Sequence, residues 1–142
     1  HQANEGCACT MNSILKQFIK HLTVGENEVV LLDMEAGVEH FGRGVDNSVD
    51  LILMIVDPSF ESLKLTKKIQ QLGDSIGKTV FFVLNKVNEL VLPTMLESID
   101  DQSKVLAVIS TDTEIARKGL VGDELMMEIP EIHMLARKIL KQ

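Results

Sequence analysis

The chain has 142 residues, of which 14 are lysine or arginine and 21 are aspartate or glutamate, so its formal net charge at pH 7 is −7. A chain of this length buries about two thirds of its unfolded surface and can fold as one domain without a disulfide framework. The acidic excess argues against a nucleic-acid partner, because binding a phosphate backbone needs concentrated positive charge. The longest wholly apolar run, residues 51–56, is far shorter than the roughly 20 residues that cross a bilayer, so we expect no membrane partner.

Near the start of the chain stand the only two cysteines, Cys7 and Cys9, separated by one residue. A disulfide between them would close a strained ring, so we expect a reducing, cytoplasmic setting. Two thiolates in one short turn suit Zn²⁺ or another thiophilic metal, and a two-fold dimer would complete a Cys₄ site. The alternative is a pair of inert, buried cysteines.

The next segments are a predicted amphipathic helix over residues 10–22 and a predicted strand over residues 29–34. Asp33 lies at the end of this strand, and a loop containing Gly37 follows. In a parallel α/β sheet such a loop faces the ligand, where the aspartate can hold a Mg²⁺-bound water and the glycine N–H can reach a terminal phosphate. The alternative is an aspartate that only caps a loop.

The rest of the chain alternates apolar strands with helical patterns, at a spacing of roughly 25 residues that is typical of strand–helix–strand units. We therefore predict an α/β fold with a mostly parallel sheet of about four strands flanked by helices. The continuous apolar run at 51–56 predicts burial on both faces of that strand. The further strands are expected at 51–57, 79–85 and 104–110, with helices beginning near Pro58, Pro93, Thr111 and Pro130.

Asn85 is the last residue of the predicted strand TVFFVLN, and Lys86 directly follows it. A side-chain amide at a strand's carboxyl end can donate to and accept from a purine edge at once. Guanine sites of the N-K-x-D kind need a carboxylate three residues after the asparagine, and this chain has Asn88 there. The pattern favours adenine over guanine, and the alternative is an asparagine that only completes the strand end.

The segment Ser110, Thr111 and Asp112 ends the last predicted strand in the same way. Loops at neighbouring strand ends converge on one edge of a parallel sheet, so this segment could form a wall of the base pocket. The alternative is a helix cap supplied by Thr111 or Asp112.

The chain contains, in this order, the segments EGCACT, VVLLDMEAGVEHFGRG, LILMIVDPS, VFFVLNKV and ISTDTEIARKG. Together these segments resemble the MinD and nitrogenase iron protein superfamily of P-loop ATPases, and most closely its CooC-type proteins, which insert nickel into carbon monoxide dehydrogenase. The resemblance implies a switch II segment at residues 33–44, with Asp33 and Gly37 in catalytic positions, and ATP or ADP with Mg²⁺ as cofactor. It implies adenine contacts from Asn85 and its neighbour Lys86 and from the loop Ser110, Thr111 and Asp112. It also implies Zn²⁺ or Ni²⁺ held by Cys7 and Cys9 between two subunits of a homodimer.

The sequence departs from the pattern of that superfamily in two features. Thr10 stands where such proteins often have proline, and no G-x-x-x-x-G-K-[ST] loop occurs in the sequence. Because the sequence also begins with His1, we expect residues 1–142 to be a single partial nucleotide-binding domain, from switch II to the C-terminus. Without the phosphate-binding loop, we expect no ATP hydrolysis by the isolated chain.

Two functions remain open at this point. One is the C-terminal part of a CooC-like ATPase that assists metal insertion into carbon monoxide dehydrogenase or a related metalloenzyme. The other is a non-catalytic metal-binding or regulatory module.

Overall fold

The computed structural model describes residues 17–19, 21–26, 28–34 and 49–141. Three strands form one parallel sheet in the order β1-β2-β3, which confirms the predicted α/β class. The later strands and helices lie where the sequence pattern predicts them, with β2 extending two residues beyond Asn85. In chain order the elements are β1 (Leu51–Val56), α2 (Phe60–Ser75), β2 (Thr79–Val87), α3 (Leu92–Glu97), the 3₁₀ turn η3 (Gln102–Lys104), β3 (Val105–Ser110), α4 (Thr113–Val121) and α5 (Pro130–Ile139).

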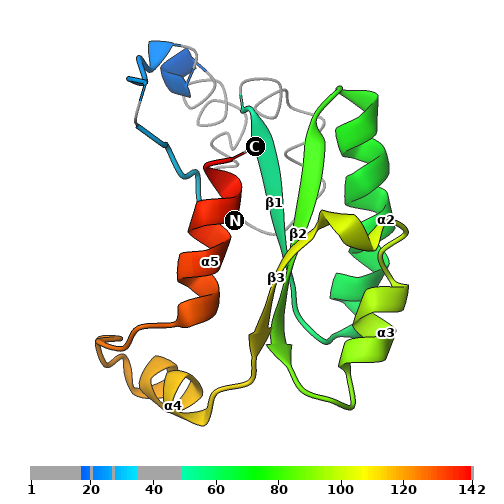
Figure 1. The fold of residues 1–142 in the computed structure, drawn as a ribbon, viewed down its shortest axis with the longest axis vertical. Coiled ribbons are helices and arrows are strands. Elements are labelled where there is room, and N and C mark those ends of the chain that lie inside the picture. The colour runs from blue at the N-terminus through cyan, green and yellow to red at the C-terminus, as the bar shows by residue number, and fades with distance from the viewer. Residues whose placement is uncertain (1–16, 20, 27, 35–48, 142) are drawn as a thin grey trace, which may run out of the picture.

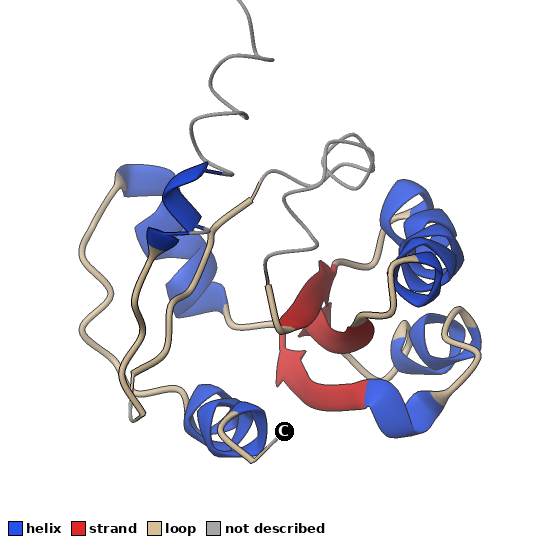
Figure 2. Cartoon of the chain, turned by 90° about the horizontal axis from the view of Figure 1, so that it is seen from above, coloured by secondary structure: helices blue, strands red, loops and turns tan. Residues whose placement is uncertain are grey.

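Helices cover both faces of the sheet. Figures 1 and 2 show α2 and α3 together on one side of the strands and α5 on the other. Successive residues of β2 point to opposite faces, so Phe82 and Leu84 pack toward α2 and α3 while Val83 packs toward α5. The larger core cluster contains Val56, Ile69, Val80, Phe82, Leu84, Val87, Met95 and Ile99, and the smaller one contains Val83, Leu106 and Leu135.

Helix α2 begins and packs through specific local features. Ser59 is its N-cap, and the Ser59 hydroxyl accepts a hydrogen bond from the Ser62 backbone N–H at 3.2 Å. Near the other end, a Cβ on Gly73 would lie only 2.4 Å from Cγ2 of Val80. The absence of a side chain at Gly73 therefore allows α2 to approach β2 closely.

The prediction of a first strand at residues 29–34 is wrong. The described residues 28–34 carry no strand, and Leu31 is 82% exposed. A strand is held by hydrogen bonds to a neighbouring strand, and in the described part of the chain β1 pairs with β2 alone. The sheet accordingly has three described strands rather than four.

Strand β1 also differs from its prediction in burial. The apolar run at 51–56 predicts a strand buried on both faces, but in β1 only Val56 is buried and Ile55 is 52% exposed. The described helices therefore cover β1 less completely than β2. No described helix has both the length and the apolar character needed to span a bilayer.

Candidate functional site

The carboxyl ends of the three parallel strands meet at one edge of the sheet, at the lower end of the molecule in Figure 1. Asp57 directly follows β1, Asn85 and Lys86 lie near the end of β2, and Ser110 ends β3. Val56 pairs with Leu84 in the parallel register, so the next residue of each strand, Asp57 and Asn85, lie side by side.

Asp57 is the centre of a small polar cluster at this edge. Its Oδ1 accepts a hydrogen bond from Nδ2 of Asn85 at 3.0 Å, and its Oδ2 lies 2.5 Å from Nζ of Lys86. The backbone N–H of Asp57 donates to Oγ of Ser62 in α2 at 3.1 Å. One half-buried carboxylate therefore connects the ends of β1 and β2.

The end of β2 is irregular where this cluster forms. The register between β2 and β3 shifts between Leu84 and Val87, and Lys86 has a φ of +56°. The ladder resumes after the shift, because the Thr111 N–H donates to the Val87 carbonyl at 2.8 Å. A left-handed residue in a strand re-aims the side chains around it, and such irregularities are common beside functional sites.

Asn88 has a structural role in the turn that follows. Its Oδ1 accepts hydrogen bonds from the backbone N–H groups of Leu90 and Val91, at 3.0 and 3.1 Å. This side chain holds the entry into α3. The position where a guanine site needs a carboxylate thus carries a turn-forming amide.

The third strand end carries a helix cap. Oδ1 of Asp112 accepts from the backbone N–H groups of Glu114 and Ile115, at 2.7 and 3.0 Å. The cap predicted for α4 is confirmed and is Asp112, while Ser110 and Thr111 are exposed. The contact of these three residues with a base stays a prediction.

The other predicted site residues are less well defined. Asp33 is exposed and lies in an irregular segment, so the prediction that it ends a strand is wrong for the reason given above. Gly37, Cys7 and Cys9 lie outside the described residues. Within the described ranges, no three histidine, cysteine, aspartate or glutamate side chains are grouped as a metal site would need.

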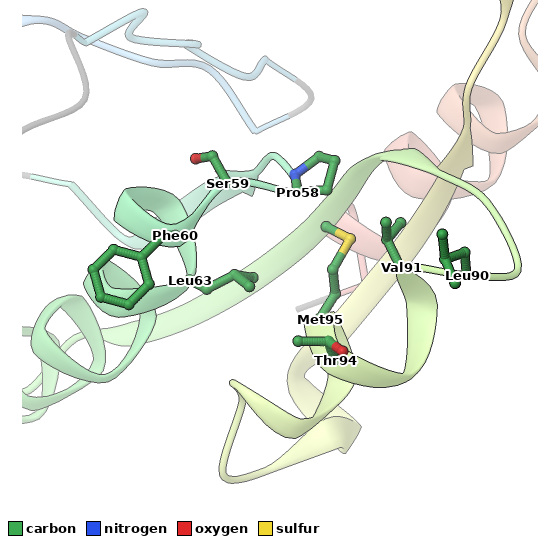
Figure 3. Close-up of a pocket in the computed structure, with 8 residues that line it drawn as sticks. All are labelled: Pro58, Ser59, Phe60, Leu63, Leu90, Val91, Thr94 and Met95. Atoms are coloured by element: carbon green, nitrogen blue, oxygen red, sulfur yellow. The ribbon is translucent and has the colours of Figure 1, made fainter.

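An apolar pocket of about 310 Å³ lies beside the polar cluster. Figure 3 shows it between the start of α2 and the start of α3, with Leu63 and Met95 pointing into it. Pro58 and Ser59, which directly follow Asp57, also line it, whereas Phe60 and Leu90 at its margins are 75% and 86% exposed.

Sequence reasoning missed Asp57 as a site residue. The signal for it was present, because Asp57 and Asn85 each come directly after an apolar run of the sequence. The sequence does not reveal the register between β1 and β2, which places Asp57 and Asn85 at the same level of the sheet.

The sequence of the chain is similar to those of several known proteins. No protein-family model matches the chain. It is 46% identical over 132 residues to an uncharacterized ATP-binding protein of Methanocaldococcus jannaschii, covering 93% of this chain and 53% of the relative. A second uncharacterized ATP-binding protein of that organism is 32% identical over 130 residues, covering 89% of this chain and 51% of the relative.

A relative with a more specific name comes from Rhodospirillum rubrum. The chain is 34% identical over 123 residues to the carbon monoxide dehydrogenase accessory protein CooC, covering 86% of this chain and 47% of that protein. These relatives support the superfamily that the sequence motifs indicate. The chain spans about half the length of the curated relatives it matches.

Proposed function

We propose that the chain is the C-terminal part of a CooC-like ATP-binding protein that assists metal insertion into a metalloenzyme. The observation that carries this proposal is the contact of Asp57, Asn85 and Lys86 at the carboxyl ends of parallel strands. Ligands of open parallel sheets bind at that edge. Two of the relatives are named as ATP-binding proteins, which favours ATP as the ligand.

In this proposal the edge of the sheet receives the adenine. Asn85 and Lys86 lie on one side of the base, and Ser110, Thr111 and Asp112 form the other side. Asp33 and Gly37 act toward the terminal phosphate and its Mg²⁺, as a switch that responds to the γ-phosphate. Residues 1–142 together form one partial nucleotide-binding domain. Hydrolysis of ATP requires a phosphate-binding loop in the intact protein.

The metal part of the proposal rests on the two cysteines. Cys7 and Cys9 of two copies would give four thiolates around Zn²⁺ or Ni²⁺, so the protein acts as a cytoplasmic homodimer. The client is carbon monoxide dehydrogenase or a related metalloenzyme, by analogy with the CooC relative. Elemental analysis tests this: one metal per dimer is expected, and an unchanged metal content after Cys7→Ser with Cys9→Ser overturns the site.

Calorimetric titration of the intact protein that carries this chain tests the nucleotide site. Asn85→Ala removes an amide that can both accept from and donate to the base, so the affinity for ATP should fall by about tenfold or more, as expected for two lost hydrogen bonds. Tripolyphosphate has no base, and its affinity should not change in the same variant. If the intact protein does not bind ATP, or if Asn85→Ala leaves ATP affinity unchanged, the assignment of this edge to adenine is wrong.

The second function proposed for the chain is a non-catalytic metal-binding or regulatory module, which would bind metal through Cys7 and Cys9. Phosphate release by the intact protein separates the two functions. Hydrolysis that is lost when ATP binding is lost supports the ATPase, whereas metal binding without any hydrolysis supports the module.

A further inference from the structure

We infer that Asp57 is a positioning residue, which fixes the Asn85 amide and thereby sets a preference for a 6-amino purine over a 6-oxo purine. The inference rests on the proposed function, because it assumes a purine nucleotide at this edge of the sheet. It adds a residue that acts through Asn85 and a chemical reason for base selectivity.

The first step is the orientation of the amide. An ionised carboxylate can only accept hydrogen bonds, so the Asn85 group 3.0 Å from Oδ1 of Asp57 must be the NH₂. The oxygen and nitrogen of a primary amide are nearly equal in size, and without such a partner the group can turn over at little cost. The contact with Asp57 therefore fixes the positions of the amide oxygen and the amide nitrogen of Asn85.

The second step is the orientation of the carboxylate itself. Lys86 engages Oδ2 of Asp57 and so leaves Oδ1 to Asn85. The Ser62 hydroxyl oxygen accepts a hydrogen bond from the backbone N–H of Asp57, which fixes the backbone from which the Asp57 side chain extends. The Asp57 and Lys86 side chains are 39% and 62% exposed, and ion pairs this exposed contribute little to stability. The cluster is therefore better explained by geometry than by stability.

The third step concerns the base. With one N–H of Asn85 directed to Asp57, the amide presents its Oδ1 as acceptor and its second N–H as donor. A 6-amino purine offers a matching N–H₂ donor at C6 and the ring-nitrogen acceptor N7 beside it, and N7 is an acceptor in a 6-oxo purine as well. A 6-oxo purine places an acceptor oxygen at C6, opposite the Oδ1 acceptor, and leaves both unpaired. The fixed amide consequently favours adenine.

The experiment compares ATP with inosine triphosphate, whose base carries oxygen at C6 and, unlike guanine, no amino group at C2. Affinities are measured by titration calorimetry on the intact protein and on its Asp57→Asn variant. The wild-type protein should bind ATP about tenfold more tightly than inosine triphosphate, as expected for one unmade hydrogen bond. In Asp57→Asn the partner can donate or accept, so the Asn85 amide can take both orientations and the preference should fall severalfold.

Asp100→Asn is the matched control. It removes a carboxylate from a surface pair with Lys67, at 3.4 Å and with both side chains more than half exposed. Asp100 precedes β3, at the amino end of the strand, so the ATP preference should stay at the wild-type value.

The outcomes separate this inference from the proposed function. If the wild-type protein binds neither nucleotide, the proposed function fails and the inference fails with it. If it binds both with equal affinity, or if Asp57→Asn keeps the full preference, the inference alone is overturned. Where the variant does not fold, equal affinity of the wild-type protein for the two nucleotides still overturns the inference.

Discussion

The contact between Gly73 and Val80 allows the packing of α2 on β2 to be tested by a double-mutant cycle. A Cβ at position 73 would meet Cγ2 of Val80 at 2.4 Å and the backbone oxygen of Lys78 at 3.0 Å. Val80 is 1% exposed and cannot turn away into solvent. Gly73→Ala must therefore push the helix away from the strand or force Val80 from its rotamer.

The size of the effect follows from two opposing terms. Overpacking a well-packed core costs about 1–3 kcal/mol, while alanine in place of a helical glycine gains up to about 1 kcal/mol. We expect Gly73→Ala to lower the free energy of unfolding by about 1–2 kcal/mol. Val80→Ala should cost roughly 2–3 kcal/mol, because two buried methyl groups are lost and a cavity is left. The new methyl at position 73 fills part of that cavity, so the double variant should lose about 1 kcal/mol less than the sum of the two single losses.

Urea unfolding of the chain, followed by circular dichroism, measures all three variants, and Gly119→Ala is the control. Gly119 lies in α4, and a Cβ there has no heavy atom within 4 Å, so alanine should raise the free energy of unfolding by roughly 0.5–1 kcal/mol. If Gly73→Ala and Gly119→Ala behave alike, the close approach of α2 to β2 is refuted. Strict additivity of Gly73→Ala and Val80→Ala would refute the assignment of the strain to this pair.

Three further predictions concern other parts of the fold. Thr66 is 1% exposed and its hydroxyl lies 2.7 Å from the carbonyl oxygen of the α3 C-cap, so Thr66→Val should cost about 1–2 kcal/mol in urea unfolding, and Thr66→Ser should cost less. Asp112→Ala removes the α4 cap and should cost about 1 kcal/mol, most of which Asp112→Ser restores. Hydrogen bonding from Arg117 lowers the pKa of the Glu114 carboxyl, so the stability it contributes is present above the ordinary pKa of glutamate and is lost as the pH falls through the lowered pKa. Arg117→Gln should raise that pKa in a carboxyl NMR titration, and an unchanged pKa would show that Arg117 is not the cause.

Local sequence patterns predicted most of the described elements because each carries its own start and stop signals. Ser59 caps α2, Pro93 lies at the start of α3, and Asp112 caps α4, and all three signals act within a few residues. The strand predicted at residues 29–34 failed because strand formation depends on a partner far away in the sequence. An apolar run alone does not reveal whether that partner is present.

The candidate site shows the same limit. Asn85 could be predicted from its place at a strand end, but its contact with Asp57 depends on the pairing of Val56 with Leu84. The left-handed Lys86 that brings its ammonium group to Asp57 is also invisible in the sequence, since no glycine marks the position. Long-range register and local backbone irregularity are set by tertiary packing.

Strand β2 connects the stable core to the candidate site, and this arrangement makes the two separable by mutation. Val80, near the start of β2, is buried in the larger core cluster, while Asn85 lies at the other end of the strand, where the ladder is irregular. Sites held on rigid elements keep their geometry while the element remains folded. Gly73→Ala should therefore lower stability and leave the ratio of ATP to inosine triphosphate affinity unchanged. Asp57→Asn should change that ratio and leave the free energy of unfolding in urea within about 0.5 kcal/mol of wild type, as for an exposed ion pair. If both variants shifted both quantities together, Asp57 would be a structural residue of the strand ends rather than a positioning residue for Asn85.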